Sequence, residues 1–261
     1  PLANPVNDAR DMRDRLLTLG FEKSNIVYRE NLKTAEIGAL LREWRSRLTA
    51  GPDTVALVFY AGHGVQIRGE NYLPTVDARV DGEEDLPHQA VKLADLTLVM
   101  VESKTRINLV FLDACRNNPY ARRFRDGTRG LAVVQPPSGT LIMHATAPGS
   151  VASDGSGRNG VFTQHLLANM ATPNMPVEMM LKKVNDDVFS STQGKQDPWP
   201  EGSIRGFFYF AQGAAPDQPK QEPARESALA TLDALEDPDD VAGLAPRLVS
   251  QLSRDGIFMR S

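Results

Sequence analysis

The fold of this chain is decided by two apolar runs, Val55-Ala-Leu-Val-Phe-Tyr60 and Ile107-Asn-Leu-Val-Phe-Leu112. Neither run alternates apolar with polar residues, and such continuity is typical of strands buried on both faces. Segments with helical spacing alternate with further strand candidates before and after the runs. The sequence therefore predicts an α/β fold whose open sheet is covered by helices on both faces.

Apolar periodicity and breaker residues predict the other elements. A first helix is expected over 5–19, ended by Gly20, and a second is expected to begin at Thr34 and to end near Gly51. The further expected elements are a strand at 26–28, a helix carrying Leu93, Leu96 and Met100, strands at 131–134 and 140–145, helices at 160–170 and 176–190, and a last strand at 207–210.

Length and composition fit one globular domain with a short appendage. The chain has 261 residues, 41% of them hydrophobic, and a net charge of −4. This weak negative charge argues against nucleic acid or an anionic membrane as a partner. No apolar run reaches the roughly 18 to 20 residues of a membrane span, so we expect a soluble protein, in the cytoplasm rather than the periplasm.

A change in composition marks the end of the main domain. Residues 1–211 are expected to form that domain, and residues 212–226, rich in Pro, Gln and charge, a linker. Residues 227–261 carry leucines at helical spacing but too few to bury a core alone. They are either a helical tail or the start of a further domain, and they are a candidate surface for a partner.

Each apolar run leads into a cluster of reactive residues. His63 lies between two glycines after the first run, and Cys115, the only cysteine, follows the second. The carboxyl ends of neighbouring strands in an open α/β sheet meet at one crevice, which would bring the two together. They suit a histidine base and a thiol nucleophile, with the backbone amides of Gly64 and Cys115 as oxyanion donors. The alternatives are a buried structural cysteine and a turn histidine bonded to a carbonyl group.

These clusters and their strands resemble the core of the caspase, metacaspase and paracaspase group. The resemblance lies in Val58-Phe-Tyr-Ala-Gly-His-Gly64 and Leu109-Val-Phe-Leu-Asp-Ala-Cys115, whose His and Cys are 52 positions apart, against about 50 in caspases. Similarity to bacterial members, often called orthocaspases, lies in Asn71-Tyr-Leu-Pro-Thr-Val-Asp77, Asp113-Ala-Cys-Arg-Asn-Asn-Pro119, Pro198-Trp-Pro and Arg205-Gly-Phe-Phe-Tyr-Phe210.

The resemblance covers about residues 1–211. It implies a caspase-like open sheet, mainly parallel, with helices on both faces. It also implies a cysteine endopeptidase with His63 and Cys115 as its catalytic pair. Members normally carry an apolar strand just before the segment that matches Pro1–Asp8, and that strand is absent from this sequence, so we expect a sheet that lacks it.

An acid two positions before the cysteine predicts the substrate preference. Caspases that cleave after Asp carry Gln at this position, whereas here it is Asp113. In metacaspases and paracaspases the matching Asp lines the S1 pocket and confers cleavage after Arg or Lys, and a second S1 carboxylate corresponds to Asp8. Two carboxylates could hold a guanidinium through paired hydrogen bonds. Asp154 is a third S1 candidate. The alternatives are helix or turn caps for Asp8 and Asp113, and a simple Asp-Gly turn for Asp154.

The loop 116–129 is rich in arginine. It carries five arginines and one acid, and it lies where caspases are cut between their large and small parts. A peptidase with basic specificity could cut itself there, at Arg123, Arg125 or Arg129. The alternative is a basic loop that is simply solvated.

No metal or other cofactor is expected. Many metacaspases require calcium, but the residues after the catalytic cysteine are Arg and Asn here, which are poor ligands for a hard cation. The acidic loop 81–85 could hold calcium, yet such a run is more often a solvated turn. His88, His144 and His165 have no metal-ligand spacing; we assign His144 to the core or the crevice wall and the other two to the surface.

The leading hypothesis is therefore an endopeptidase whose substrates are proteins or peptides with a basic P1 residue. The first alternative is a catalytically silent scaffold that binds a partner through 227–261. The second is a peptidase of the same fold that prefers Asp or Asn at P1.

Overall fold

The computed structural model describes residues 2–48, 54–115, 120, 131–148 and 157–213. Its larger sheet has the strand order β1-β5-β6-β7. The strands are β1 (Val55–His63), β5 (Ile107–Cys115), β6 (Thr140–His144) and β7 (Trp199–Gly202). The first three are parallel and β7 is antiparallel to β6, which confirms the prediction of an open, mainly parallel sheet.

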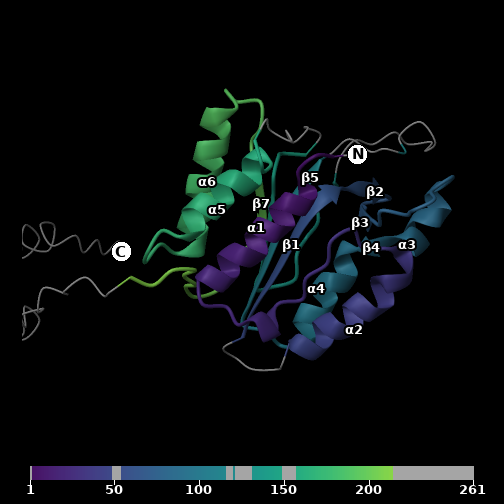
Figure 1. Ribbon diagram of the computed structural model, residues 1–261, viewed down its shortest axis with the longest axis horizontal. Helices are drawn as coiled ribbons and strands as arrows, with labels where there is room; N and C mark the ends of the chain where they lie inside the picture. The colour runs from purple at the N-terminus through teal and green to yellow at the C-terminus, as the bar shows by residue number, and fades with distance from the viewer. Residues whose placement is uncertain (1, 49–53, 116–119, 121–130, 149–156, 214–261) are drawn as a thin grey trace, which may run out of the picture. The chain divides into compact units, whose positions relative to one another are not determined.

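Helices cover both faces of this sheet (Figure 1). One face packs against α1 (Pro5–Thr18), α5 (Val161–Met170) and α6 (Val177–Ser191), and the other against α2 (Ile37–Arg47) and α4 (Leu93–Glu102). Strand β5 supplies both cores, because successive side chains point to opposite faces. Leu109 and Phe111 join the α1/α5/α6 core, and Val110 and Leu112 join the α2/α4 core.

A second, smaller sheet was not predicted. It consists of β2 (Val65–Ile67), β3 (Glu70–Pro74) and β4 (Ala90–Lys92), paired antiparallel. Short helical elements lie at α3 (Leu86–Gln89), η1 (Lys23–Asn25), η2 (Thr34–Glu36) and η3 (Glu83–Asp85). Strand β2 begins two residues after His63, so the small sheet is joined directly to the end of β1.

Three strand predictions were wrong in detail. Residues 26–28 form no strand ladder in the described part of the chain, although Ile26 has extended backbone angles. Residues 131–134 also form no ladder, and side chains bind their backbone instead. Residues 207–210 contribute one isolated bridge, between Pro176 and Tyr209, while the last strand of the large sheet is β7. Apolar content therefore indicated segments without helical structure, but it did not show which of them pair with another strand.

Strand β1 occupies the edge of the described sheet. Its sequence is as apolar as that of β5, yet eight of its nine residues are only half-buried. By contrast, Ile107 to Leu112 of β5 are almost fully buried. The continuous run thus has the pattern of a central strand but lacks a second neighbour among the described residues.

The predicted linker and tail lie almost wholly outside the described residues, which end at Gly213. Among the described residues, we find no helix with both the length and the apolar character of a membrane span.

Phe162 in the first turn of α5 tests the core that supports the site. Its ring is 0% exposed, so Phe162→Ala is expected to lower the free energy of unfolding by about 3–5 kcal/mol. Urea unfolding followed by circular dichroism measures this loss. The control is Phe207→Ala, because Phe207 is 65% exposed; equal midpoints for the two variants would contradict the packing described.

Candidate active site

The pairing of β1 with β5 brings the two predicted catalytic residues to one register position. His63 and Cys115 are Cα partners at the last pair of the parallel ladder. Neighbouring strands lie about 4.8 Å apart, so the two backbones are one strand spacing apart there. The side chain of Cys115 lies outside the described set, whereas the His63 side chain is half-buried.

Tyr60 supports the backbone that carries His63. Its hydroxyl donates a hydrogen bond to the His63 carbonyl oxygen at 2.8 Å. The ring lies against Gly62, where a Cβ atom would come within 2.5 Å of the Tyr60 hydroxyl oxygen, and Gly62 has a φ of +155°. A larger residue at position 62 would displace the ring, which explains the glycine before the histidine.

The two predicted S1 carboxylates meet at the start of α5. Asp8 and Asp113 are 2% and 8% exposed. The Gly160 amide donates to Asp8 Oδ1 at 3.0 Å. The Thr163 amide and hydroxyl donate to Asp113 Oδ2 at 3.2 and 2.6 Å. A Cβ atom built on Gly160 would lie 2.8 Å from Asp113 Oδ2 and 3.5 Å from Asp8 Oδ2. Residues from α1, β5 and the start of α5 thus bring two buried carboxylates close to one glycine.

The hydrogen bonds of Asp113 bear on the alternative that this residue is a helix or turn cap. Asp113 accepts from the first turn of α5, fifty residues later in the chain, while the turn that follows Asp113 lies outside the described residues. Helix N-termini attract negative charge because their first amide groups lack partners within the helix. These bonds hold Asp113 in place at the start of α5.

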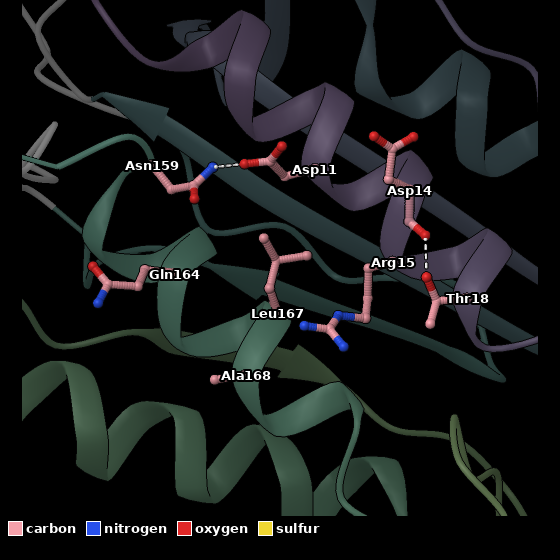
Figure 2. Close-up of a pocket in the computed structure, with 8 residues that line it drawn as sticks. All are labelled: Asp11, Asp14, Arg15, Thr18, Asn159, Gln164, Leu167 and Ala168. Carbon is pink, nitrogen blue, oxygen red and sulfur yellow. Dashed lines mark hydrogen bonds between the residues drawn. The ribbon is translucent and has the colours of Figure 1, made fainter.

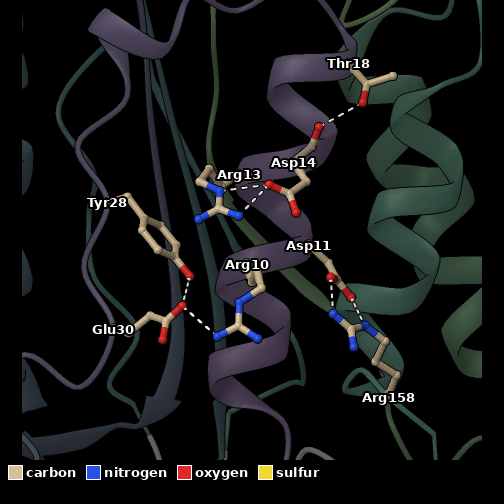
Figure 3. A network of polar contacts seen from close by, with 8 residues as sticks. All are labelled: Arg10, Asp11, Arg13, Asp14, Thr18, Tyr28, Glu30 and Arg158. Atoms are coloured by element: carbon tan, nitrogen blue, oxygen red, sulfur yellow. Dashed lines mark hydrogen bonds and ion pairs between the residues drawn. The ribbon is translucent and has the colours of Figure 1, made fainter.

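An ion pair that sequence reasoning missed ties the segment before Gly160 to α1 (Figure 3). Arg158 donates to both carboxylate oxygens of Asp11, each at 2.8 Å, and Asn159 donates to Asp11 Oδ2 at 2.9 Å. The Arg158 hydrogen bond is the main reason that the pKa of Asp11 lies below its ordinary value. One signal in the sequence could have indicated that Asp11 belongs to this region: it lies three positions after Asp8, on the same face of α1.

A groove of about 480 Å³ lies beside this ion pair, between α1 and α5 (Figure 2). It is lined by Asp11, Asp14, Arg15, Thr18, Asn159, Gln164, Leu167 and Ala168. Of the predicted site residues whose side chains the structure describes, His63, Asp8 and Asp113 do not line it. The groove lies beside the segment that binds Asp8 and Asp113.

Several predicted residues lie outside the described part of the chain. These are the third S1 candidate and the proposed self-cleavage sites, namely Asp154, Arg123, Arg125 and Arg129. His144 is 1% exposed and lies in the core, 3.3 Å from Glu201. His88 is exposed, and His165 is half-buried with its ring 3.1 Å from the Ser191 hydroxyl.

The acidic loop is organised by hydrogen bonds within itself. Asp85 Oδ2 accepts from the amides of Asp81 and Gly82 at 2.9 and 3.0 Å, which lowers the pKa of Asp85. A search of the described residues finds no group of three or more His, Cys, Asp or Glu side chains arranged to hold a metal ion.

Comparison with known proteins agrees with this architecture. The family model of the caspase domain matches residues 1–209. The crystal structure of caspase-1 from Spodoptera frugiperda is similar in fold, with a TM-score of 0.53 and 18% sequence identity, over 82% of this chain and 84% of that one. A search of curated proteins found no match. The match over residues 1–209 shows that the chain belongs to the caspase-domain family and is a cysteine-type endopeptidase of caspase-like fold.

Proposed function

We propose that this endopeptidase cleaves peptide bonds after Arg or Lys, with Cys115 as nucleophile and His63 as general base. The observation that carries the proposal is the meeting of Asp8 and Asp113 at Gly160. The common register position of His63 and Cys115 supports the catalytic pair.

The proposed reaction follows acyl transfer to a thiol. His63 takes the proton of Cys115, and the thiolate attacks the carbonyl carbon of the P1 residue. The amides of Gly64 and Cys115 donate hydrogen bonds to the oxyanion that forms. His63 then gives its proton to the leaving amine, and water attacks the acyl-enzyme in a second step that frees Cys115.

The burial of Asp8 and Asp113 favours a cationic P1 side chain. Two carboxylates that are 2% and 8% exposed have lost most of their water, and desolvated charges are costly unless they are paired and hydrogen-bonded. A guanidinium or ammonium group would pair with them, and guanidinium can bond to both in its plane. An acidic P1 side chain would instead add a third negative charge to the pocket.

We also propose that residues 212–226 link the domain to a partner-binding tail at 227–261, and that a further strand belongs beside β1. The half-buried edge of β1 supports the further strand, because eight of its nine residues, seven of them apolar or small, lack the cover that β5 receives. The scaffold alternative predicts that the tail acts without turnover, and the other-specificity alternative predicts cleavage after Asp or Asn.

Matched fluorogenic peptides ending in Arg, Lys and Asp test the proposal. The Arg and Lys peptides are expected to be cleaved and the Asp peptide spared, with or without a calcium chelator. Cys115→Ala is expected to abolish turnover. Asp113→Asn is expected to lower kcat/KM for the Arg peptide by about 100-fold or more, because breaking a buried charge pair costs about 3–5 kcal/mol.

The control is Asp14→Asn, since Asp14 lies on the same helix as Asp8 but its side chain is 54% exposed. Equal loss of activity in both variants would count against an S1 role for Asp113. Cleavage of the Asp peptide in preference to the Arg peptide would show the alternative specificity.

Gly160→Ala tests the shape of the proposed S1 pocket. The added methyl group would lie against both carboxylates, 2.8 Å from Asp113 Oδ2 and 3.5 Å from Asp8 Oδ2. We expect KM for the Arg peptide to rise at least about tenfold, the cost of a small steric loss in a binding pocket, while iodoacetamide still labels Cys115 at the wild-type rate. Gly157→Ala is the matched control, because no heavy atom of the described residues lies within 4 Å of its added Cβ. An unchanged KM in Gly160→Ala would place P1 elsewhere.

Self-cleavage in the Arg-rich loop is a separate consequence of basic specificity. Purified enzyme is expected to yield two fragments whose new ends follow Arg123, Arg125 or Arg129, as read by mass spectrometry. Replacing all three by Gln is expected to leave one band. Active enzyme that stays intact and does not cut the Cys115→Ala chain in trans would rule self-cleavage out.

A further inference from the structure

Residues 131–134 are held beside the active site by side chains rather than by a strand ladder. Asn71 of β3, which is 2% exposed, binds both backbone groups of Ala132. Its Nδ2 donates to the Ala132 carbonyl oxygen at 2.9 Å, and its Oδ1 accepts from the Ala132 amide at 2.7 Å. The neighbouring Val134 amide donates to Glu201 Oε2 at 3.1 Å. The segment is therefore fixed to the small sheet and to β7.

Leu131, the residue before Ala132, lies against Gly64 and shares a core cluster with Ala114. It is 2% exposed. A Cβ atom built on Gly64 would lie 2.7 Å from Leu131 Cδ2 and 3.2 Å from Ala114 Cβ. Gly64 directly follows His63, and Ala114 directly precedes Cys115. The Leu131 side chain thus fills the space against the peptide unit that carries the Gly64 amide.

We propose that Asn71 is a positioning residue for catalysis: by binding both backbone groups of Ala132, it seats Leu131 against Gly64 and thereby fixes the amide that receives the oxyanion. This inference rests on the proposed role of the Gly64 amide. A primary amide suits this role, because its donor and acceptor stand on one carbon atom and match the amide and carbonyl groups of a single residue. Asp would present an acceptor to the Ala132 carbonyl oxygen, and Leu would leave both buried backbone groups without a partner.

The effect of Asn71 is expected in kcat rather than in KM. The oxyanion exists only in the transition state and the tetrahedral intermediate, so a displaced donor weakens the transition state and leaves substrate binding unchanged. The two carboxylates of the proposed S1 pocket, Asp8 and Asp113, do not depend on the Asn71–Ala132 hydrogen bonds. Asp113 bonds to α5, on the face of the sheet that packs against α1, whereas Leu131 packs in the α2/α4 core.

The test compares Asn71→Asp and Asn71→Leu with Asn108→Val. Asn108 is also 2% exposed and hydrogen-bonded, but it lies at the opposite end of β5 from Cys115. Three quantities are measured for each chain: kcat and KM on the peptide that the wild type cleaves best, the rate of Cys115 alkylation by iodoacetamide, and the melting temperature. Alkylation forms no oxyanion, so it reports whether the thiol remains accessible and reactive.

Both Asn71 variants are expected to lose between about 10-fold and 1000-fold in kcat, the upper figure being the loss of one oxyanion donor. KM and the alkylation rate are expected to stay within twofold of the wild-type values. Asn108→Val is expected to lower the melting temperature without lowering kcat. If the Asn71 variants fail to fold, Leu131→Val, which removes one methylene from the contact with Gly64, is expected to lower kcat in the same selective way.

The inference is overturned if folded Asn71 variants keep the wild-type kcat, or if kcat, alkylation and melting temperature fall together as in a general loss of structure. These outcomes differ from failure of the proposed function. In that case Cys115→Ala would keep wild-type turnover, or the wild type would cleave no peptide, whatever residue stands at position 71.

Discussion

The parallel ladder between β1 and β5 is the constraint on which the site depends. Nine consecutive residue pairs, from Val55 with Ile107 to His63 with Cys115, keep the two strands in one register. A slip of one residue would move every side chain of one strand to the other face. It would also separate His63 from Cys115 along the strand direction. The buried side chains of β5 that specify the register therefore align His63 with Cys115 as well.

Sequence patterns predicted the elements whose burial is unambiguous. The continuous run of β5 predicted a central strand, and the spacing of Leu93, Leu96 and Met100 predicted the buried face of α4. The two reactive clusters were placed correctly because parallel strands of one sheet end at the same edge. The same reasoning overestimated the burial of β1. An apolar run indicates that a strand is suited to a position between two neighbours, but it does not show that both neighbours are present.

The rest depended on partners that are distant in the chain. Strand β7 carries a proline and a glycine in four residues, so no local pattern distinguishes it from a loop. Residues 131–134 are apolar enough for a strand, but Asn71 takes the place of a neighbouring backbone. Asp8 and Asp113 were named as S1 candidates through a resemblance. In the structure, Gly160 and Thr163 bind these two carboxylates at the start of α5. The sequence could not show this, because it depends on how α1 and α5 pack on the sheet.

The start of α5 explains how two buried carboxylates can coexist with a stable domain. Each would be costly in an apolar core, yet backbone amides at positions 160 and 163 and the Thr163 hydroxyl bond to them, and the helix N-terminus adds favourable positive potential. The same donors bind the charged form of a carboxylate and fix the positions of its oxygen atoms. The packing of α5 against α1 and β5 therefore sets where the two carboxylates lie, and the proposed preference for Arg or Lys at P1 depends on that geometry.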